Sequence, residues 1–239
     1  SGEPGLDNTT ITIRGVNTLG NNSPLVVIDG IANRSMVGLN SADIESIDIL
    51  KDASAAIYGA QAANGVILIT TKRGSAGKMQ VDVTFNQGWN TPTVIPKMSD
   101  AATYATMLNE TDVYKGRTPR YSETDIQLYK DGSDPWGHPN TDWYAETFKR
   151  FSHQRVATLS ASGGSEVVKY FVSFGTNYQD AIYKNSATNY GQANFRSNID
   201  AKIADNIRLS FDLAGRQENR NYPTRSSSEI FSFLIKGKP

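Results

Sequence analysis

The alternation of apolar and polar residues divides the chain into two parts. In the first part, short apolar runs are bounded by turn-forming residues, and strands are predicted at residues 10–14, 25–28, 46–49 and 65–71. Asn40 or Ser41 is predicted to cap a helical turn, and the Ala-rich residues 53–63 favour a short helix interrupted at Gly59. The first part is therefore predicted to be a small mixed α/β unit.

From Met79 onward the pattern changes to long strands with one apolar and one polar face. Such segments are predicted around residues 79–86, 157–161, 170–175, 194–203 and 207–213. The polar face of the last two segments carries Arg196, Asp200, Lys202, Arg208 and Asp212. An antiparallel sheet with one wet side has this pattern, and so does the wall of a transmembrane β-barrel. A twisted soluble sheet is the alternative.

The connections between these strands alternate in length. A long connection, residues 90–152, joins the first two strands, and residues 181–188 join the third and fourth. The other two connections need only residues 163–166 and 204–206. Outer-membrane barrels have short turns at one end and long loops at the other, whereas a soluble sandwich has no reason to keep its short turns on one edge. This asymmetry favours the barrel, with residues 90–152 as a long extracellular loop.

Composition excludes several classes of protein. The chain has 239 residues, with 24 Lys and Arg balanced by 24 Asp and Glu, which argues against a nucleic-acid binder that works through a basic field. It has no cysteine and only His138 and His153, which leaves no basis for thiolate chemistry or a multi-histidine metal site. Asp200 and Asp212 are weak candidates for a hydrolytic carboxylate pair. We therefore expect no catalytic residue, no metal and no cofactor.

Several blocks of sequence carry a resemblance to a known family. Residues 10–15, 24–30, 43–54, 57–59 and 63–72 resemble the plug of SusC/RagA-family TonB-dependent outer-membrane transporters. Residues 140–143, 162–166, 169–173 and 183–186 look like the first barrel strands of the same family. The resemblance implies a plug domain at residues 1–78 without its amino-terminal part. At residues 79–239 it implies about five strands of a barrel that has about 22 in the complete protein, so we expect a fragment.

The resemblance also implies a function. Members of this family import oligosaccharides or oligopeptides across the outer membrane of Gram-negative bacteria, with the plug gating the barrel lumen. The implied partners are TonB, whose contact segment would precede this sequence, a SusD-like surface lipoprotein and the lipid bilayer, with no nucleic acid. A siderophore or vitamin receptor and a soluble secreted β-rich glycan-binding domain are the alternatives.

By resemblance, the plug motif has a structural or gating role. Its residues are Asp29, Gly30, Lys51, Asp52, Tyr58, Gly59, Asn64 and Gly65. Asp29 and Gly30 predict a turn after a buried strand rather than a ligand-facing acid. Asn64 and Gly65 predict a turn that needs a positive φ. Lys51, Asp52 and Tyr58 could form a polar switch that responds to TonB, or they could cap and anchor the plug.

Aromatic residues of the second part are candidates for substrate contact. Trp136, Trp143 and Tyr144 in the long loop could stack on sugars or on peptide side chains. A structural role is favoured, in which they pin the loop or lie in the aromatic girdle. Tyr170, Tyr178 and Tyr190 lie near strand ends, where an aromatic girdle is expected.

Overall fold

The N-terminal unit, residues 21–71, is a small mixed sheet with short helical turns. A computed structural model describes residues 3–5, 10–13, 15 and 21–239 of the protein. The unit contains β1 (Leu25–Ile28), β2 (Ile31–Ala32), β3 (Ile44–Leu50) and β4 (Val66–Thr71), with the 3-10 helices η1 (Ser41–Asp43) and η2 (Asp52–Ala62). The sheet order is β2-β1-β4-β3, and only the β1–β4 pair is parallel. The predicted mixed α/β unit is therefore confirmed.

Both faces of this small sheet are covered by apolar side chains. One cluster contains Leu25, Val27 and Val66 with alanines of η2, and the other contains Ile28, Ile67 and Ile69. Successive residues of a strand point to opposite faces, so a strand covered on both faces has a continuous apolar run. This explains the unbroken apolar segments of β1 and β4.

The predicted strand at residues 10–14 is wrong over residues 10–13, and residue 14 lies outside the described residues. Instead of pairing with a strand, Ile13 packs its side chain against the cluster of Ile28, Ile67 and Ile69. Alternation alone identifies the buried side chain but supplies no hydrogen-bonding partner for the backbone.

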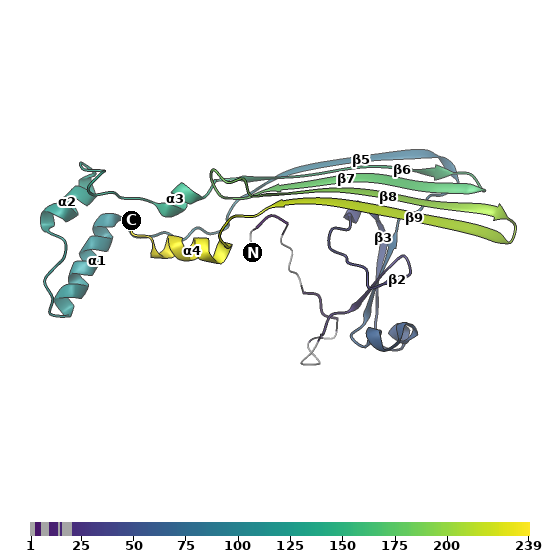
Figure 1. Cartoon of the computed structure of the whole chain (residues 1–239), viewed down its shortest axis with the longest axis horizontal. Helices are drawn as coiled ribbons and strands as arrows, with labels where there is room; N and C mark the ends of the chain where they lie inside the picture. The colour runs from purple at the N-terminus through teal and green to yellow at the C-terminus, as the bar shows by residue number, and fades with distance from the viewer. Residues whose placement is uncertain (1–2, 6–9, 14, 16–20) are drawn as a thin grey trace.

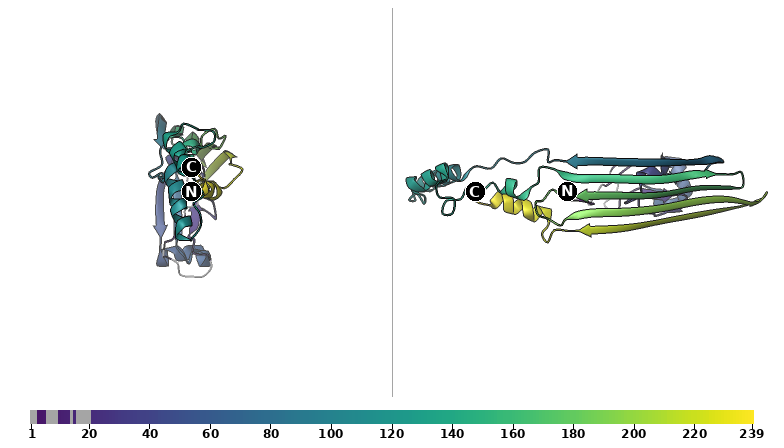
Figure 2. Two further views of the ribbon diagram at one scale, coloured as in Figure 1. Left: turned by 90° about the vertical axis from the view of Figure 1, so that its left-hand side faces the viewer. Right: turned by 90° about the horizontal axis from the view of Figure 1, so that it is seen from above.

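The wall sheet, β5 to β9, is a long antiparallel sheet whose strands follow one another in sequence order (Figure 1). Its strands are β5 (Gly77–Asn90), β6 (Ser152–Gly164), β7 (Val168–Asp180), β8 (Asn189–Ala204) and β9 (Ile207–Asn221). Each of the five predicted segments lies in one of these strands. The N-terminal unit lies against one face of the wall sheet, and the view from above shows it behind the strands (Figure 2).

The opposite, outer face of the wall sheet is apolar and exposed. The strand register places Val83, Leu159, Phe174 and Phe195 in one row across four strands. Val83 is 73% exposed and Phe195 is 41% exposed, whereas the neighbouring Arg196, which points to the other face, is 5% exposed. The wall sheet is therefore turned with its polar face toward the N-terminal unit and its apolar face away from it.

The long connections of the wall sheet gather at one end, which we call the distal end. Residues 165–167 and 205–206 form short turns at the other end. The distal connections are residues 91–151, which contain α1 (Ala101–Tyr114), α2 (Glu123–Asp131) and α3 (Trp143–Thr147), and residues 181–188. The helix α4 (Ser227–Lys236) follows β9 at the same end (Figure 1). The predicted alternation of long and short connections is confirmed.

One aromatic cluster ties the distal connections together. Tyr144 and Phe148 pack against Tyr183 and against Leu234 of α4. The rings of Phe148 and Tyr183 lie 5.7 Å apart between centroids, and the two residues also form an isolated β-bridge. Each of the three distal segments therefore contributes to the same buried cluster. No helix in the described part of the protein is long and apolar enough to cross a membrane.

A histidine clasp closes the loop that follows α2. His138 Nδ1 lies 2.8 Å from Asp134 Oδ2, and His138 Nε2 lies 3.1 Å from Asp125 Oδ1. Two carboxylate acceptors require both ring nitrogens to donate, which only the protonated imidazole can do. The hydrogen bonds to Asp134 and then Asp125 raise the pKa of His138 above its ordinary value of 6.5.

We predict that order in this loop depends on pH. Because the folded pKa of His138 is raised, its stabilising contribution is fully present below about pH 6.5 and is lost as the pH rises through the higher folded pKa. Hydrogen–deuterium exchange of residues 122–139, corrected for intrinsic exchange rates, should therefore show less protection at pH values above the raised pKa of His138. The carboxylates have the opposite pH dependence. The hydrogen bond from His138 lowers the pKa of Asp134, so this carboxylate becomes protonated, and its contribution is lost, only in acid.

His138→Gln provides the control for this prediction. Glutamine does not titrate, so the loss of protection at rising pH should disappear in the variant. An unchanged pH dependence in His138→Gln would show that another group is responsible.

Candidate functional site

The candidate site is the polar contact between the N-terminal unit and the inner face of the wall sheet. At its centre, Arg196 of β8 lies between two buried carboxylates. Its Nη1 is 3.5 Å from Oδ2 of Asp29, and its Nε is 3.5 Å from Oδ2 of Asp43. The Arg196 side chain is 7% exposed and both aspartate side chains are 4% exposed. The two parts of the protein thus meet through a buried charge cluster.

Local backbone geometry presents Asp29 to the wall sheet. Ile28 and Ile31 pair across a two-residue loop in which Asp29 has φ 51° and Gly30 has φ 80°. Positive φ at both central positions defines a type I′ hairpin turn, so the predicted turn is confirmed. The Asp29 carboxylate accepts hydrogen bonds from the Thr71 backbone N–H at 2.8 Å and the Thr71 hydroxyl at 2.9 Å. The same residue is therefore both a turn residue and a partner of Arg196.

Asp43 is positioned by a capped helical turn. Asn40 caps η1 by accepting a hydrogen bond from the Ala42 backbone N–H at 3.1 Å, as the sequence predicted. Among the described residues, Asp43 Oδ1 and Arg196 Nε have no hydrogen-bond partner. The charge cluster is thus held by ion pairing at 3.5 Å more than by short hydrogen bonds. Removing one charge from such a cluster leaves its partners buried and uncompensated.

The segment that leaves the N-terminal unit is also held by the wall sheet. Asn198 donates to the Thr71 hydroxyl at 2.9 Å and to the Lys72 carbonyl at 2.8 Å. Arg73 forms ion pairs with Asp200 at 2.9 Å and with Asp212 at 2.6 Å. The two carboxylates that we considered for hydrolysis therefore do converge, but they converge on the guanidinium of Arg73.

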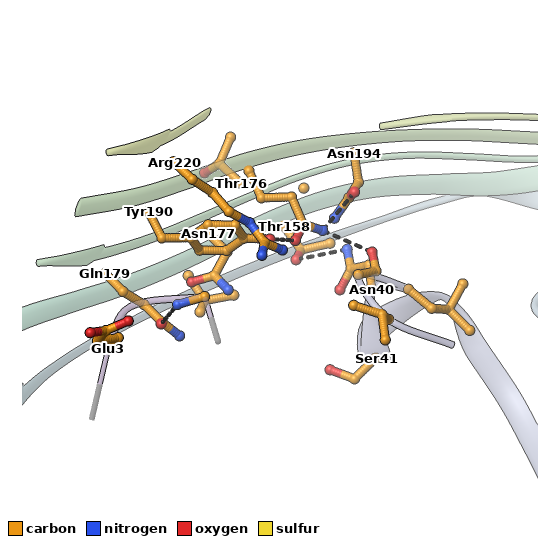
Figure 3. A pocket seen from close by; sticks show the side chains of 17 residues that line it. Glu3, Asn40, Ser41, Thr158, Thr176, Asn177, Gln179, Tyr190, Asn194 and Arg220 are labelled. Atoms are coloured by element: carbon orange, nitrogen blue, oxygen red, sulfur yellow. Dashed lines mark hydrogen bonds between the residues drawn. The ribbon is translucent and has the colours of Figure 1, made fainter. Parts of the chain in front are cut away.

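A polar cavity of about 340 Å³ separates the two parts beside this contact (Figure 3). The N-terminal unit contributes residues 37–41, and β6, β7 and β8 contribute most of the opposite side. The polar residues that line it are Glu3, Asn40, Ser41, Thr158, Thr176, Asn177, Gln179, Tyr190, Gln192, Asn194 and Arg220. Amides and hydroxyls dominate this set, so the cavity is suited to uncharged hydrogen-bonding groups.

Tyr190 belongs to this cavity and not to an outward girdle. The girdle prediction is wrong for this residue, because Tyr190 is buried and its hydroxyl donates to Glu218 at 3.0 Å on the inner face. Tyr190 and Arg196 are separated by an even number of positions on β8, so they share a face. The position of Tyr190 could have been inferred from the sequence by counting along the strand from Arg196.

Other residues of the predicted plug motif lie away from the wall sheet. Lys51 is the exposed residue that precedes η2, and its carbonyl accepts from the Ser54 hydroxyl at 2.6 Å. The Asp52 side chain lies outside the described residues. Tyr58 packs against the apolar cluster of Leu25, Val27 and Val66, and Gly59 breaks η2 with φ 71°. η2 lies at the end of the N-terminal unit far from the wall sheet (Figure 1), so the structure does not bring these residues to Asp29.

Asn64 and Gly65 form the predicted turn before β4. Gly65 has φ 92°, and a Cβ added there would lie 2.9 Å from Ile13 Cδ1 and 3.2 Å from the Leu50 carbonyl oxygen. Asn64 donates to the Asn21 carbonyl at 2.8 Å. Both the backbone angle and the lack of space therefore require glycine at position 65.

The three aromatic candidates of the long loop have different surroundings. Trp136 is 95% exposed, whereas Tyr144 is 2% exposed within the distal cluster. The Trp143 indole donates to the Lys238 carbonyl at 2.5 Å. The structure therefore does not join them into one surface, and their contact with substrate stays a prediction.

Comparisons with known proteins match this architecture. Residues 1–66 match the family model described as the TonB-dependent receptor plug domain. TonB-dependent receptor P26 of Formosa agariphila is 36% identical over 219 residues, which cover 88% of this chain and 21% of the relative. TonB-dependent receptor SusC of Bacteroides thetaiotaomicron is 33% identical over 227 residues, covering 84% of this chain and 21% of that receptor.

A solved structure is similar to this chain in both fold and sequence. The RagAB peptide importer in its 'closed-closed' state has a TM-score of 0.66 and 27% identity, and the match covers 89% of this chain and 26% of the solved one. A compact unit held on the polar face of an antiparallel sheet is thus the arrangement of a TonB-dependent receptor plug and the adjoining strands. The chain belongs to the SusC/RagA family of these receptors. It spans about a fifth of the length of the curated relatives it matches.

We predict that Arg196→Met loosens the N-terminal unit in the full-length receptor. The substitution leaves Asp29 and Asp43 buried without a counter-charge, which costs about 3–5 kcal/mol. Protease cleavage within residues 21–71, followed at increasing urea concentration, should begin at a lower concentration than in the wild type.

Arg208→Met is the matched control, because Arg208 lies on the same face of the wall sheet but is exposed. It should leave the cleavage threshold unchanged. Adding Asp29→Asn to Arg196→Met should recover part of the loss, since one uncompensated charge is removed. Equal thresholds for Arg196→Met and the wild type would show that the cluster does not hold the unit.

Gly65→Ala is predicted to destabilise the N-terminal unit by about 1–3 kcal/mol, because alanine is strained at this φ and its Cβ meets Ile13 and Leu50. The same proteolysis assay measures the effect. Gly88→Ala is the control, because no atom lies within 4 Å of the position of its added Cβ. Similar cleavage thresholds for the two variants would contradict the prediction.

Proposed function

We propose that the complete protein imports a large nutrient, an oligosaccharide or an oligopeptide, across the outer membrane of a Gram-negative bacterium. In this proposal the N-terminal unit is the plug that closes the lumen, and residues 79–239 contribute strands to the surrounding wall. The observation that carries it is the buried contact of Arg196 with Asp29 and Asp43, which holds a compact unit against the polar face of the wall sheet. The protein acts in transport and has no catalytic role.

The outer face of the wall sheet supports a position in the lipid bilayer. Val81, Phe85, Leu209 and Phe211 are each more than half exposed on that face. Apolar surface in water costs about 25 cal/mol per Å², so a water-soluble glycan-binding domain would bury such rows rather than display them. Within the described residues, β5 and β9 each pair with one neighbouring strand, and further strands of a barrel would pair with their free edges.

The charge cluster also bears on how passage through the barrel lumen is gated. The contacts of Arg196 and Arg73 hold the N-terminal unit against β8 and β9, so the passage opens only when this unit moves or rearranges. We assign that rearrangement to TonB, which would draw on the inner-membrane proton gradient, and closure of the extracellular side to a SusD-like surface lipoprotein. The RagAB peptide importer, a solved structure to which this chain is similar, favours a large nutrient over a siderophore or a vitamin.

A disulfide lock tests the gating step in the full-length receptor. Thr71 and Asn198 are in direct hydrogen-bond contact at 2.9 Å, and this chain has no native cysteine. Oxidation of the Thr71→Cys/Asn198→Cys double variant should tie the N-terminal unit to β8. We expect the oxidised cells to lose uptake of labelled oligosaccharide or oligopeptide pools, and reduction to restore it.

The controls separate locking from loss of the native contacts. Each single cysteine variant should be insensitive to oxidation. Ser160→Cys/Ser173→Cys joins two paired residues within the wall sheet and should also leave uptake unchanged. Full uptake by the verified, oxidised Thr71–Asn198 disulfide form would show that transport does not require this part of the unit to move.

A further inference from the structure

The outer face of the wall sheet changes from apolar to polar near the distal end. On β5 the exposed apolar side chains end at Phe85, and Gln87 follows on the same face. On β9 they end at Leu213, and the next side chains on this face are Gln217 and Asn219. A barrel wall has an apolar band where it meets hydrocarbon and polar positions beyond it. The distal edge of this band therefore marks the level at which lipid head groups would begin.

A group of basic and aromatic side chains lies directly beyond this edge. Arg155 of β6 pairs with Tyr178 of β7, and its guanidinium carbon is 4.8 Å from the centroid of the tyrosine ring. In the next row, Trp89 pairs with His153, and their ring centroids lie 6.2 Å apart in an edge-to-face arrangement. Alternation along the paired strands places all four side chains on the outer face with Phe85. We call Trp89, His153, Arg155 and Tyr178 the rim patch.

The spacing along the strands places Arg155 at the level of the head groups. Its row, which includes Gln87, follows the row of Phe85 by one repeat of the strand, or about 7 Å. A strand tilt of about 40° reduces this to about 5 Å along the membrane normal. The head-group region is about 5–8 Å deep on each side of the hydrocarbon, so the guanidinium lies within it. Trp and Tyr side chains favour the same layer.

The positive charge of this region is not neutralised by the protein. Arg155 is exposed and, in the described part of the chain, forms no hydrogen bond or ion pair. Arg150 is also exposed and lies over the Phe151 ring, 5.2 Å from its centroid, just before β6. The carboxylate of Asp180, at the end of β7, is already paired with Lys149 at 2.8 Å. A guanidinium that lies over a ring keeps its in-plane N–H donors available for an anion.

From these observations we propose that the rim patch binds the phosphate of a lipid head group in the leaflet at the distal end. The planar donors of Arg155 match two oxygens of one phosphate, and Arg150 adds attraction. The patch is continuous with the apolar band, so a phosphate that carries acyl chains satisfies both surfaces, whereas a free phosphate satisfies only one. The inference rests on the proposed function, which places the outer face in a bilayer.

The lipid selectivity of the full-length receptor tests the rim patch. A bimane label on Gln87→Cys, the position paired with Arg155, reports lipid at this site through quenching by brominated acyl chains. The receptor is reconstituted in phosphatidylcholine with a minor fraction of phosphatidic acid, and either lipid is brominated in turn. We expect phosphatidic acid to be enriched beside the label. Adding Arg155→Gln should reduce this preference about fivefold, the equivalent of about 1 kcal/mol.

Arg117→Gln in the same labelled background is the matched control. Arg117 is an exposed arginine in the loop between α1 and α2, away from the strands (Figure 1). Its substitution should leave the preference unchanged. Equal losses in the two variants, or no preference in the parent, would overturn the inference. Displacement of phosphatidic acid by inorganic phosphate at constant ionic strength would also overturn it, because the ligand would then be a free anion.

Insertion into bilayers is measured separately by flotation with vesicles of phosphatidylcholine alone. The parent and Arg155→Gln should both float with the vesicles, because the apolar band and not the guanidinium drives insertion. This also shows that the variant is folded. Failure of the parent to insert would reject the bilayer position and the proposed function with it. Normal insertion without selectivity for phosphatidic acid would reject the rim patch alone.

Discussion

The structure depends on one buried charge, the guanidinium of Arg196, which lies between Asp29 and Asp43. A buried ion is unfavourable unless opposite charge lies close by, so the wall sheet and the N-terminal unit each present a group that the other must neutralise. This mutual requirement fixes which face of the wall sheet meets the unit. It also sets their register, because Asn198 and Asp200 follow Arg196 on the same face and reach Thr71 and Arg73.

The contact between the N-terminal unit and the wall sheet changes along the length of the sheet. Near Arg196 it is close and charged, whereas toward the distal end it opens into the polar cavity lined by Asn177 and Tyr190. Glycines at the contact let the two parts approach closely, as at Gly175, where an added Cβ would lie 2.5 Å from the Asn40 amide nitrogen. The close region holds the unit in place, whereas the open region leaves a polar cavity between the two parts.

The distal end is organised by a different force. There the aromatic cluster of Tyr144, Phe148 and Tyr183 gathers segments that are far apart in the sequence, and burial of their rings stabilises the arrangement. The cluster is apolar and independent of the charge cluster, so the distal connections and the N-terminal unit are held to the wall sheet by separate means. Changes at one contact therefore need not disturb the other.

Local chemistry in the sequence was enough to predict the elements. Alternation of apolar and polar residues identified the five wall strands and their polar face, and the unbroken apolar runs identified β1 and β4. The Asp-Gly and Asn-Gly dipeptides identified the turns at Gly30 and Gly65. Each of these features depends only on residues that are close together in the sequence. The pairing of Asp29 and Asp43 with Arg196 could not be read in this way, since more than 150 positions separate them in the sequence. The inward position of Tyr190, the convergence of Asp200 and Asp212 on Arg73, and the polar cavity between the two parts likewise depend on which faces meet. Only the tertiary structure decides that, because the electrostatic and packing energies that select it act between groups brought together by the fold.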